Sequence, residues 1–220
     1  MHLPVQHIIY QNSFWLLPQR GLYWEEQKAL IIADLHLGKT GHFRKSGIAV
    51  PQSIYKDDLH RLFSIIQQYK PEQLIIVGDM FHSKANKEMD LFTRWRSDVS
   101  QLHIHLVKGN HDILNTAYYT STEIQLTEEK LTVGRFCFVH DPVACEAITN
   151  EEELYYFCGH LHPGITLHGN SRQSLSFPCY LFAHTHAVLP AFSAFTGMYM
   201  IRKKQDEKVF AIVNDNIIAF

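Results

Sequence analysis

Five short apolar runs, each followed by a polar side chain that can bind a metal ion, constrain this chain of 220 residues more than any other feature. The runs span residues 29–33, 74–77, 104–107, 136–139 and 155–158. They are rich in Ile, Val and Phe, which is typical of buried strands. Because ligands gather at the carboxyl ends of strands in open α/β sheets, the pattern predicts a functional site at that edge.

Two helical patterns separate the first three runs. Apolar residues recur at spacings of three and four between Pro51 and Pro71, and a second such stripe runs from Met89 to Leu102. Strands that alternate with helices imply parallel pairing. From about Glu129 the pattern changes to strands and turns, with a hairpin predicted around 205–207. We find no repeat or linker-like stretch and expect a single α/β domain over residues 1–220.

Histidine is unusually abundant, with 15 residues, and it is the commonest metal ligand among the side chains. The net charge of -2 excludes a global basic field that would hold nucleic acid. The N-terminal region lacks the features of a signal peptide, and no apolar run reaches the length of a membrane span. The four cysteines form no CxxC pair. Together these features predict a soluble, cytoplasmic protein with reduced core thiols and no membrane partner.

The side chains that follow the five runs form one chemically coherent set of metal ligands. They are two carboxylates, one amide and four imidazoles: Asp34, His36, Asp79, Asn110, His140, His160 and His162. Oxygen and nitrogen donors without thiolate suit Mn, Fe, Zn or Co. Seven donors exceed one tetrahedral site and fit two metals if one carboxylate bridges them. Each residue alone is more simply explained by packing, but the placement of all of them favours a dinuclear site of the kind that acts on phosphate esters.

The series DLH, GD, GNHD, a lone His and GHLH resembles the calcineurin-like metallophosphoesterase superfamily. The resemblance implies a four-layer αββα sandwich with two divalent cations, with Mn²⁺ favoured and Fe or Zn as alternatives. It implies that the first metal is held by Asp34, His36, Asp79 and His162. It implies that the second is held by Asp79, as the bridge, with Asn110, His140 and His160. By the same resemblance, His111 protonates the leaving oxygen or stabilises charge on the phosphoryl group.

A closer resemblance extends from Asp34 to Gly197. The segments are DLHLGKTGHFRKSGIAVP (34–51), GDMFHS (78–83), GHLHP (159–163), RQSLSFPCY (172–180) and LPAFSAFTG (189–197). They are similar to the bacterial ligase-associated metallophosphoesterases, which are found beside a DNA ligase and a helicase and are regarded as DNA-repair endonucleases. Ser193 departs from this pattern, which usually has glycine there. His184 and His186 are not part of it; we expect them to be surface or packed polar residues, and this pair is the first to check for a third metal.

We therefore expect a dinuclear-metal phosphodiesterase that acts on DNA as an endonuclease or exonuclease linked to repair. His162 is the second imidazole of GHLH, and the resemblance implies that this residue is typical of the phosphodiesterase and nuclease branch of the superfamily. A small-molecule phosphodiesterase, for example one acting on cyclic nucleotides, and a non-catalytic scaffold remain as alternatives. Arg44 is expected to touch substrate phosphate, or else to be a solvated surface residue. His82 is expected to contact substrate or support Asp79 or His111, with loop packing as the alternative.

Overall fold

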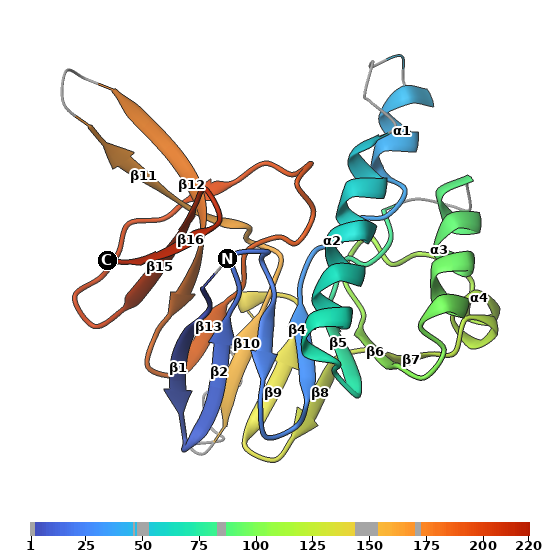
Figure 1. The fold of residues 1–220 in the computed structure, drawn as a ribbon, viewed down its shortest axis with the longest axis horizontal. Coiled ribbons are helices and arrows are strands. Elements are labelled where there is room, and N and C mark those ends of the chain that lie inside the picture. The colour runs from blue at the N-terminus through green and yellow to red at the C-terminus, as the bar shows by residue number, and fades with distance from the viewer. Residues whose placement is uncertain (1–2, 46, 48–52, 83–86, 144–153, 170–172) are drawn as a thin grey trace.

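The structure, a computed structural model, describes residues 3–45, 47, 53–82, 87–143, 154–169 and 173–220. In this part of the chain two β-sheets pack face to face, and helices cover the outer face of the first sheet (Figure 1). The strands of the first sheet are, in spatial order, β1 (Val5–Ile9), β2 (Asn12–Leu16), β3 (Leu22–Trp24), β4 (Ala29–Ile32), β5 (Gln73–Val77), β6 (His103–Val107) and β7 (Ile124–Thr127). As predicted, β4, β5 and β6 are parallel; β7, which the sequence pattern did not predict, is parallel to β6, and β1 to β3 extend the sheet with antiparallel pairs.

The second sheet contains the later strands. In spatial order they are β14 (Tyr199–Met200), β11 (Pro163–His168), β12 (Ser174–Phe182), β13 (His186–Val188), β10 (Tyr155–Cys158), β9 (Phe136–Val139) and β8 (Lys130–Val133). In addition, β15 (Lys208–Val213) pairs with β12, and β16 (Asn216–Ala219) pairs with β15. Strands β9, β10 and β13 are mutually parallel, so their carboxyl ends also share one edge. The β11–β12 hairpin projects from the body of the molecule (Figure 1).

The helices whose bounds the structure describes all precede β7. They are α1 (Lys39–Lys45), α2 (Ser53–Tyr69), α3 (Lys87–Asp98) and α4 (Thr116–Ser121). The predicted stripes correspond to α2 and α3, and their apolar residues, such as Leu62 and Phe92, are fully buried against the first sheet. The end of α2 has a local cause, because Lys70 adopts a left-handed backbone (φ 47°) and Pro71 cannot continue a helix.

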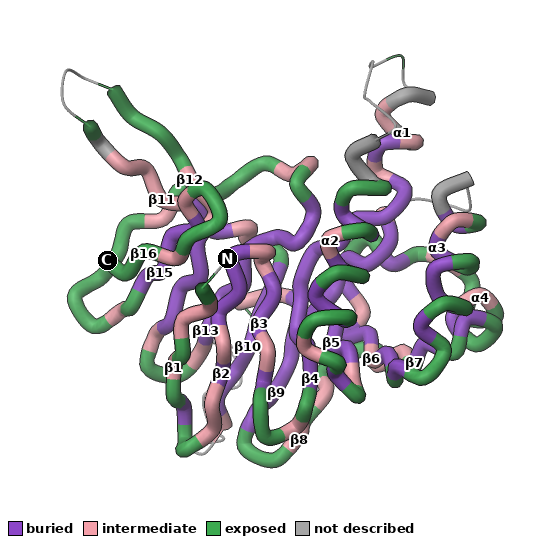
Figure 2. Tube along the Cα trace, in the orientation of Figure 1, coloured by how far each residue is buried: buried purple, intermediate pink, exposed green. Residues whose placement is uncertain are grey.

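Strands near the centre of the first sheet are buried on both faces, which explains their continuous apolar sequences. In β4, Leu30 packs towards the helices, whereas Ile31 packs towards the second sheet. Buried residues, purple in Figure 2, accordingly concentrate along the inner strands of both sheets. Between the sheets the rings of Trp24 and Phe136 lie 4.8 Å apart. Such aromatic pairs each add about 0.5–1.5 kcal/mol beyond the area they bury, so they hold the two sheets in register.

The layered α/β sandwich predicted from the sequence is confirmed, with helices, first sheet and second sheet as three of its layers. After β9 only Pro142 and Val143 of the described residues are helical, so the described part of the chain shows three of the four expected layers. The predicted C-terminal hairpin is wrong in position. A turn does occur at Lys204–Glu207, but the hairpin is made by β15 and β16, whose two-residue turn at Asn214 and Asp215 has positive φ at both positions.

Three of the four cysteines, Cys137, Cys158 and Cys179, are free and buried. This agrees with the prediction of reduced core thiols. Cys145 lies outside the described residues.

Candidate metal centre

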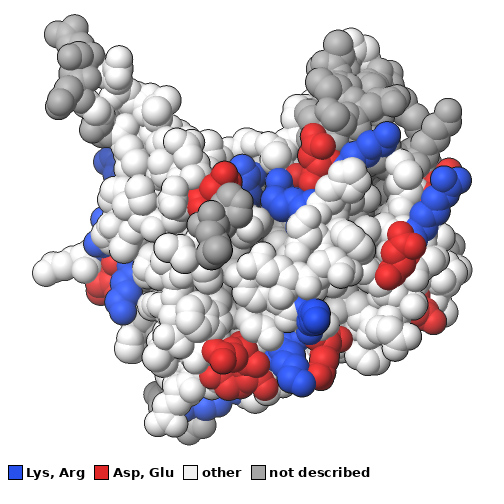
Figure 3. Space-filling model, in the orientation of Figure 1, with Lys and Arg blue, Asp and Glu red and all other residues white. Residues whose placement is uncertain are grey.

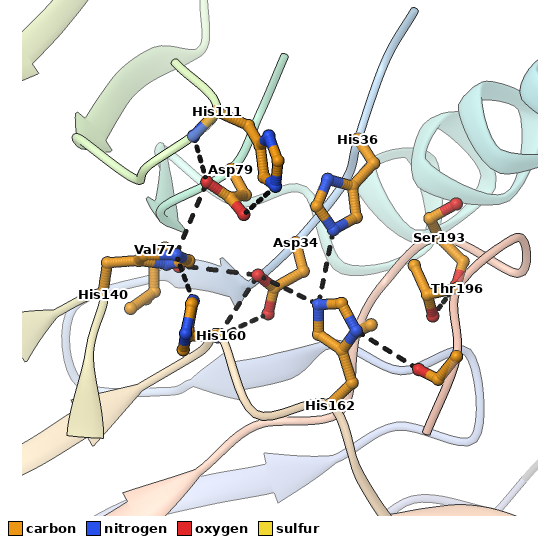
Figure 4. Close-up of polar contacts among 12 residues, drawn as sticks. Asp34, His36, Val77, Asp79, His111, His140, His160, His162, Ser193 and Thr196 are labelled. Atoms are coloured by element: carbon orange, nitrogen blue, oxygen red, sulfur yellow. Dashed lines mark hydrogen bonds and ion pairs between the residues drawn. The ribbon is translucent and has the colours of Figure 1, made fainter. Parts of the chain in front are cut away.

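The carboxyl ends of the parallel strands in both sheets lie at the same edge of the molecule, where the metal-competent side chains converge. Asp34 follows β4 and Asp79 follows β5 in the first sheet, whereas His140 follows β9 and His160 follows β10 in the second. Figure 4 shows these side chains pointing towards one another, together with His36 and His162. The centre therefore exists only when the two sheets are packed.

At this edge the backbone adopts conformations that residues other than glycine rarely take. Positive φ angles occur at Asp34 (55°), His36 (51°), Asp79 (50°), His160 (65°) and His162 (50°). Such left-handed conformations cost free energy and cluster at functional sites, where the surrounding structure enforces them. Here they turn the chain sharply at the strand ends and direct successive ligands inwards.

Three glycines stand directly before ligand motifs, and each permits a close approach. A Cβ atom on Gly78 would lie 2.0 Å from Nδ1 of His140, and Gly78 itself has a φ of 76°. A Cβ atom on Gly109 would lie 2.2 Å from the backbone nitrogen of Asp79. At Gly159 it would lie 2.8 Å from a carboxylate oxygen of Asp34. A glycine before an aspartate was interpretable from sequence as a simple turn, but here it makes room for the neighbouring ligand.

Asp34, His36 and His162 form the first triad. Nε2 of His162 lies 3.4 Å from Oδ1 of Asp34 and 3.3 Å from Nε2 of His36. Asp34 is fully buried, and both of its carboxylate oxygens accept the backbone N–H of His160, at 3.2 and 3.0 Å. The three ligand atoms lie within 4.8 Å of one another, close enough to share one cation.

Asp79, His140 and His160 form the second triad. Nε2 of His140 lies 3.4 Å from Oδ1 of Asp79 and 3.2 Å from Nδ1 of His160. Asp79 and His140 are buried, whereas His160 is exposed. Nδ1 of His140 also lies 4.0 Å from Oδ1 of Asp34, so the two triads are adjacent.

The protonation of the imidazoles tests whether the triads fit a metal. Nδ1 of His140 lies 3.2 Å from the carbonyl oxygen of Val77, and Nδ1 of His162 lies 3.2 Å from that of Gly197. A carbonyl only accepts, so each Nδ1 carries the proton and leaves Nε2 with a lone pair for a metal. In addition, the buried Nδ1 of His36 has no hydrogen-bond partner among the described residues. The residues fit divalent cations.

The close packing of these polar groups shifts the pKa values of three residues in the metal-free site. Burial opposes a charge on His140, but the carboxylates of Asp79 and Asp34 outweigh it and raise its pKa to about 9. Burial likewise opposes the charge of Asp79, yet hydrogen bonding to His140 holds its pKa below the ordinary value. Burial, aided by the neighbouring Lys39, lowers the pKa of His36 to about 2. This lysine, at the start of α1, was not predicted as part of the site.

His111 borders the second triad with a side chain that is 48% exposed. Its backbone N–H donates to Oδ1 of Asp79 at 2.9 Å, and its Nε2 lies 3.9 Å from Oδ2 of the same residue. The ring of His82 packs against that of His111 with centroids 4.2 Å apart, and against His36 at 5.3 Å. Asp112 accepts the backbone N–H groups of Gly109 and Phe81 and so fixes the GNHD turn.

The remaining predicted residues differ in where they lie. Asn110 is exposed and shares with His140 the lining of a cleft of about 400 Å³. The side chain of Arg44 lies outside the described part of the structure. His184 is exposed, and within the described residues neither it nor His186 joins a group of three metal-competent side chains. The third metal considered from the sequence therefore has no support here.

One supporting element was recognised only as a motif, the segment 189–197. Its backbone N–H groups at Phe192 and Ser193 donate to the carbonyls of Ala33 and Asp34, at 2.7 and 3.1 Å. The segment is itself held by the buried Asp58 and by Arg61, which form an ion pair at 2.7 Å. The Asp58 carboxylate accepts the N–H of Ala194, and Arg61 donates to the carbonyl of Phe192.

Arg20 adds a further tie to the same segment. Its Nη1 donates to the carbonyl of Ser193 at 2.8 Å. Asp58 and Arg61 are three residues apart in α2, but no spacing in the sequence links this pair to Arg20, which lies between β2 and β3.

Comparison with known proteins places these observations in context. Residues 28–188 match the calcineurin-like phosphoesterase family. Nuclease MPE from Pseudomonas putida is similar over 95% of this chain and 96% of its own, with 27% identity and a TM-score of 0.80. Yfce, a phosphoesterase from E. coli, covers 86% of this chain and 96% of its own, with 13% identity and a TM-score of 0.44. No curated protein matches the chain. Among the described residues, none of the helices has the length and apolar character needed to cross a bilayer.

Proposed function

The chain belongs to the calcineurin-like phosphoesterase family and is a metal-dependent phosphoester hydrolase, and on this premise we propose that it is a dinuclear-metal nuclease that cleaves DNA. The observation that carries the proposal is the likeness to a nuclease over nearly the whole length of both chains. The complete triads and the exposed His111 beside them argue against a non-catalytic scaffold.

The proposed cations are two, one at each triad, with Asp79 as the bridge and Asn110 as a further ligand of the second. Mn²⁺ suits this donor set of carboxylates, imidazoles and an amide, as do Fe and Zn. When bound, such a pair polarises a phosphoryl oxygen and lowers the pKa of water, so that hydroxide is available near neutral pH.

The protein's own residues supply orientation and a proton. The carbonyls of Val77 and Gly197 hold the rings of His140 and His162 so that each Nε2 faces its triad. We assign to His111 the proton that the leaving oxygen needs, because its side chain is open to solvent and anchored to Asp79 through its backbone. His82 packs on this ring and limits its rotation.

The substrate is proposed to be a diester because clefts adjoin both triads, one at His140 and one at His162. A diester has a substituent on each side of the phosphorus, and each substituent then has a cleft to enter. Lys and Arg side chains are interspersed with Asp and Glu on the face shown in Figure 3, in keeping with the net charge of -2. Attraction of the substrate is therefore assigned to the local positive charge of the loaded centre.

A paired assay tests the proposal directly. The purified chain with Mn²⁺ is given a single-stranded oligonucleotide and, separately, bis-p-nitrophenyl phosphate. We expect hydrolysis of both. Hydrolysis of the small diester with intact DNA would replace the nuclease by a small-molecule phosphodiesterase. Bound Mn²⁺ without activity on either substrate would favour a scaffold.

The proposed setting is DNA repair in the cytoplasm, with a DNA ligase and a helicase as partners. The family resemblance of the motifs supports the partners, and the buried free thiols suit a reducing compartment. Affinity purification of the tagged chain from its own cells, with and without nuclease treatment, tests whether either partner binds the protein rather than shared DNA.

A further inference from the structure

A small cleft adjoins the first triad and has a chemically mixed lining. Its volume is about 200 Å³, and His162 forms part of its wall. Clefts that enclose whole small molecules usually measure roughly 300–1,000 Å³. This cleft therefore suits one unit of a longer substrate whose reacting group lies at the metal centre.

Arg20 is the cationic group of this lining. Its backbone has a φ of 68°, and its Nη1 is anchored to the carbonyls of Ser193 at 2.8 Å and Ala191 at 3.5 Å. Among the described residues no carboxylate lies within ion-pair distance of Arg20. Asp58 influences Arg20 only through space and is ion-paired with Arg61, so two guanidinium groups stand near one buried carboxylate and leave an excess positive charge.

A guanidinium group in this setting matches one kind of ligand particularly well. It keeps its charge in proteins and presents several donors in a rigid plane, which suits the oxygens of a phosphate group. Because Nη1 is already bonded to backbone carbonyls, the guanidinium of Arg20 is held in place before substrate arrives. Less conformational entropy is then lost on binding.

Other parts of the lining come from the β11–β12 hairpin and the chain before β14. Ser176 and Pro178 of β12 and Met198 line it, and Thr196 adds a hydroxyl group from the segment 189–197. The hydroxyl of Ser176 lies 3.0 Å from that of Thr166. Apolar surface and a fixed cation in one cleft fit a sugar and its phosphate.

We propose that this cleft binds the nucleotide adjacent to the scissile phosphodiester, with Arg20 as the substrate-binding residue that contacts its phosphate. This inference rests on the proposed function, because it requires a nucleic acid strand at the metal centre. It adds a specificity element, since a strand with a flanking phosphate occupies the cleft and a small diester does not.

The test compares a strand with a diester that has no flanking phosphate. With Mn²⁺, Arg20→Gln should raise KM for single-stranded oligothymidylate roughly tenfold, as expected for one charge-assisted hydrogen bond. Any loss of kcat/KM for bis-p-nitrophenyl phosphate, which would come only from loosening of the segment 189–197, should be clearly smaller than the loss for oligothymidylate. In EDTA, the slope of log K against log salt for oligothymidylate binding should become shallower by about 0.7, the value for one lost phosphate contact.

A second substitution guards against a folding defect in the first. Ser176→Glu places a carboxylate at the mouth of the cleft on an exposed strand and should weaken oligothymidylate binding. Ser176→Gln is the neutral control. Ser174→Glu adds the same charge two residues away, at an exposed position outside the lining, and should have little effect.

The outcomes separate this inference from the proposed function. Equal losses on both substrates in Arg20→Gln, with an unchanged salt slope, would reduce Arg20 to a structural tie. Equal effects of Ser176→Glu and Ser174→Glu on oligothymidylate binding would also overturn the assignment of this cleft as a nucleotide-binding site. Failure of the unmodified chain to cleave oligothymidylate while it hydrolyses bis-p-nitrophenyl phosphate would instead overturn the proposed function.

Discussion

The two triads have similar ligand sets, but different parts of the chain hold their imidazoles in place. Each joins both sheets: the first takes Asp34 and His36 from the first sheet and His162 from the second, whereas the second takes only Asp79 from the first sheet. Each contains a pair of ring nitrogens 3.2–3.3 Å apart that face one another. The difference lies in what holds the imidazoles and in how open the triad is.

The first triad depends on a long irregular segment. His162 is oriented by the carbonyl of Gly197, at the end of the segment 189–197, and this segment is held by Asp58 and Arg61 from α2. The second triad depends on regular strands. His140 is oriented by the carbonyl of Val77 in β5, and Gly78 makes room for its ring. Distant substitutions should therefore disturb the first triad, and only substitutions at strand ends should disturb the second.

His111→Ala should have the largest effect on rate. A general acid contributes about 10²–10⁴-fold, so kcat for the oligonucleotide should fall by about that factor. Because His111 contacts Asp79 through its backbone, which the substitution keeps, both metals should stay bound. Metal content and kcat are measured together, with His184→Ala as an exposed control. Loss of a metal from His111→Ala would show that the residue is a ligand.

Gly78→Ala should break the second triad alone. A methyl group here would overlap the ring of His140, and alanine would also have to take a φ of 76°. Together the clash and the left-handed backbone should lower the free energy of unfolding by about 4 kcal/mol. The variant should also bind one Mn²⁺ ion instead of two. Gly134→Ala is the matched control, because Gly134 has a φ of 59° with nothing within 4 Å. Equal losses in the two variants, measured by urea unfolding, would refute the role in ligand packing.

Asp58→Asn should weaken the first triad from a distance. Asp58 is 2% exposed and its charge is shared by two arginines, so its neutralisation should cost about 3 kcal/mol. Affinity for the first Mn²⁺ should fall about tenfold as the segment 189–197 loosens, while affinity for the second stays constant. Calorimetric titration with Mn²⁺ measures both. Asp57→Asn, at an exposed neighbour, is the control, and an unchanged first affinity in Asp58→Asn would contradict the proposed support.

The sequence predicts this centre well where the place of a residue along its strand determines its role. It predicts the centre poorly where packing between separate elements determines which residues meet. The runs that became β4, β5, β6, β9 and β10 are buried on both faces or face other buried layers, so they read as continuous apolar stretches. The ligands follow from those strand ends. The strands β1 to β3 mix buried residues with partly buried or exposed ones over three to five positions, which leaves too little pattern.

The division into triads shows the same limit. Whether His162 or His160 lies with Asp34 depends on how the second sheet packs on the first, because the two histidines are separated by one residue. Likewise, Arg20 meets the Asp58–Arg61 pair of α2 only through the folded segment 189–197. Sequence spacing contains no record of such contacts.

His7 offers the smallest effect and tests a contact between the sheets where no triad is involved. Its ring packs 4.3 Å from that of Phe182, and burial, with Lys208 nearby, lowers its pKa from 6.5 to about 4. The fold therefore favours the neutral ring, and this stabilisation is complete above pH 6.5 and lost as the pH falls towards 4. After allowance for solvent screening it amounts to about 1 kcal/mol. His7→Phe should flatten stability over this range, and an unchanged pH profile would contradict the assignment.

The central claim is that each triad binds one divalent cation with residues from both sheets. The most direct test is the number of Mn²⁺ ions bound per chain after equilibrium dialysis, measured by mass spectrometry of the metal. We predict two for the unmodified chain, one for His162→Ala in the first triad and one for His140→Ala in the second. A single ion in the unmodified chain, or two ions retained in both variants, would contradict the account.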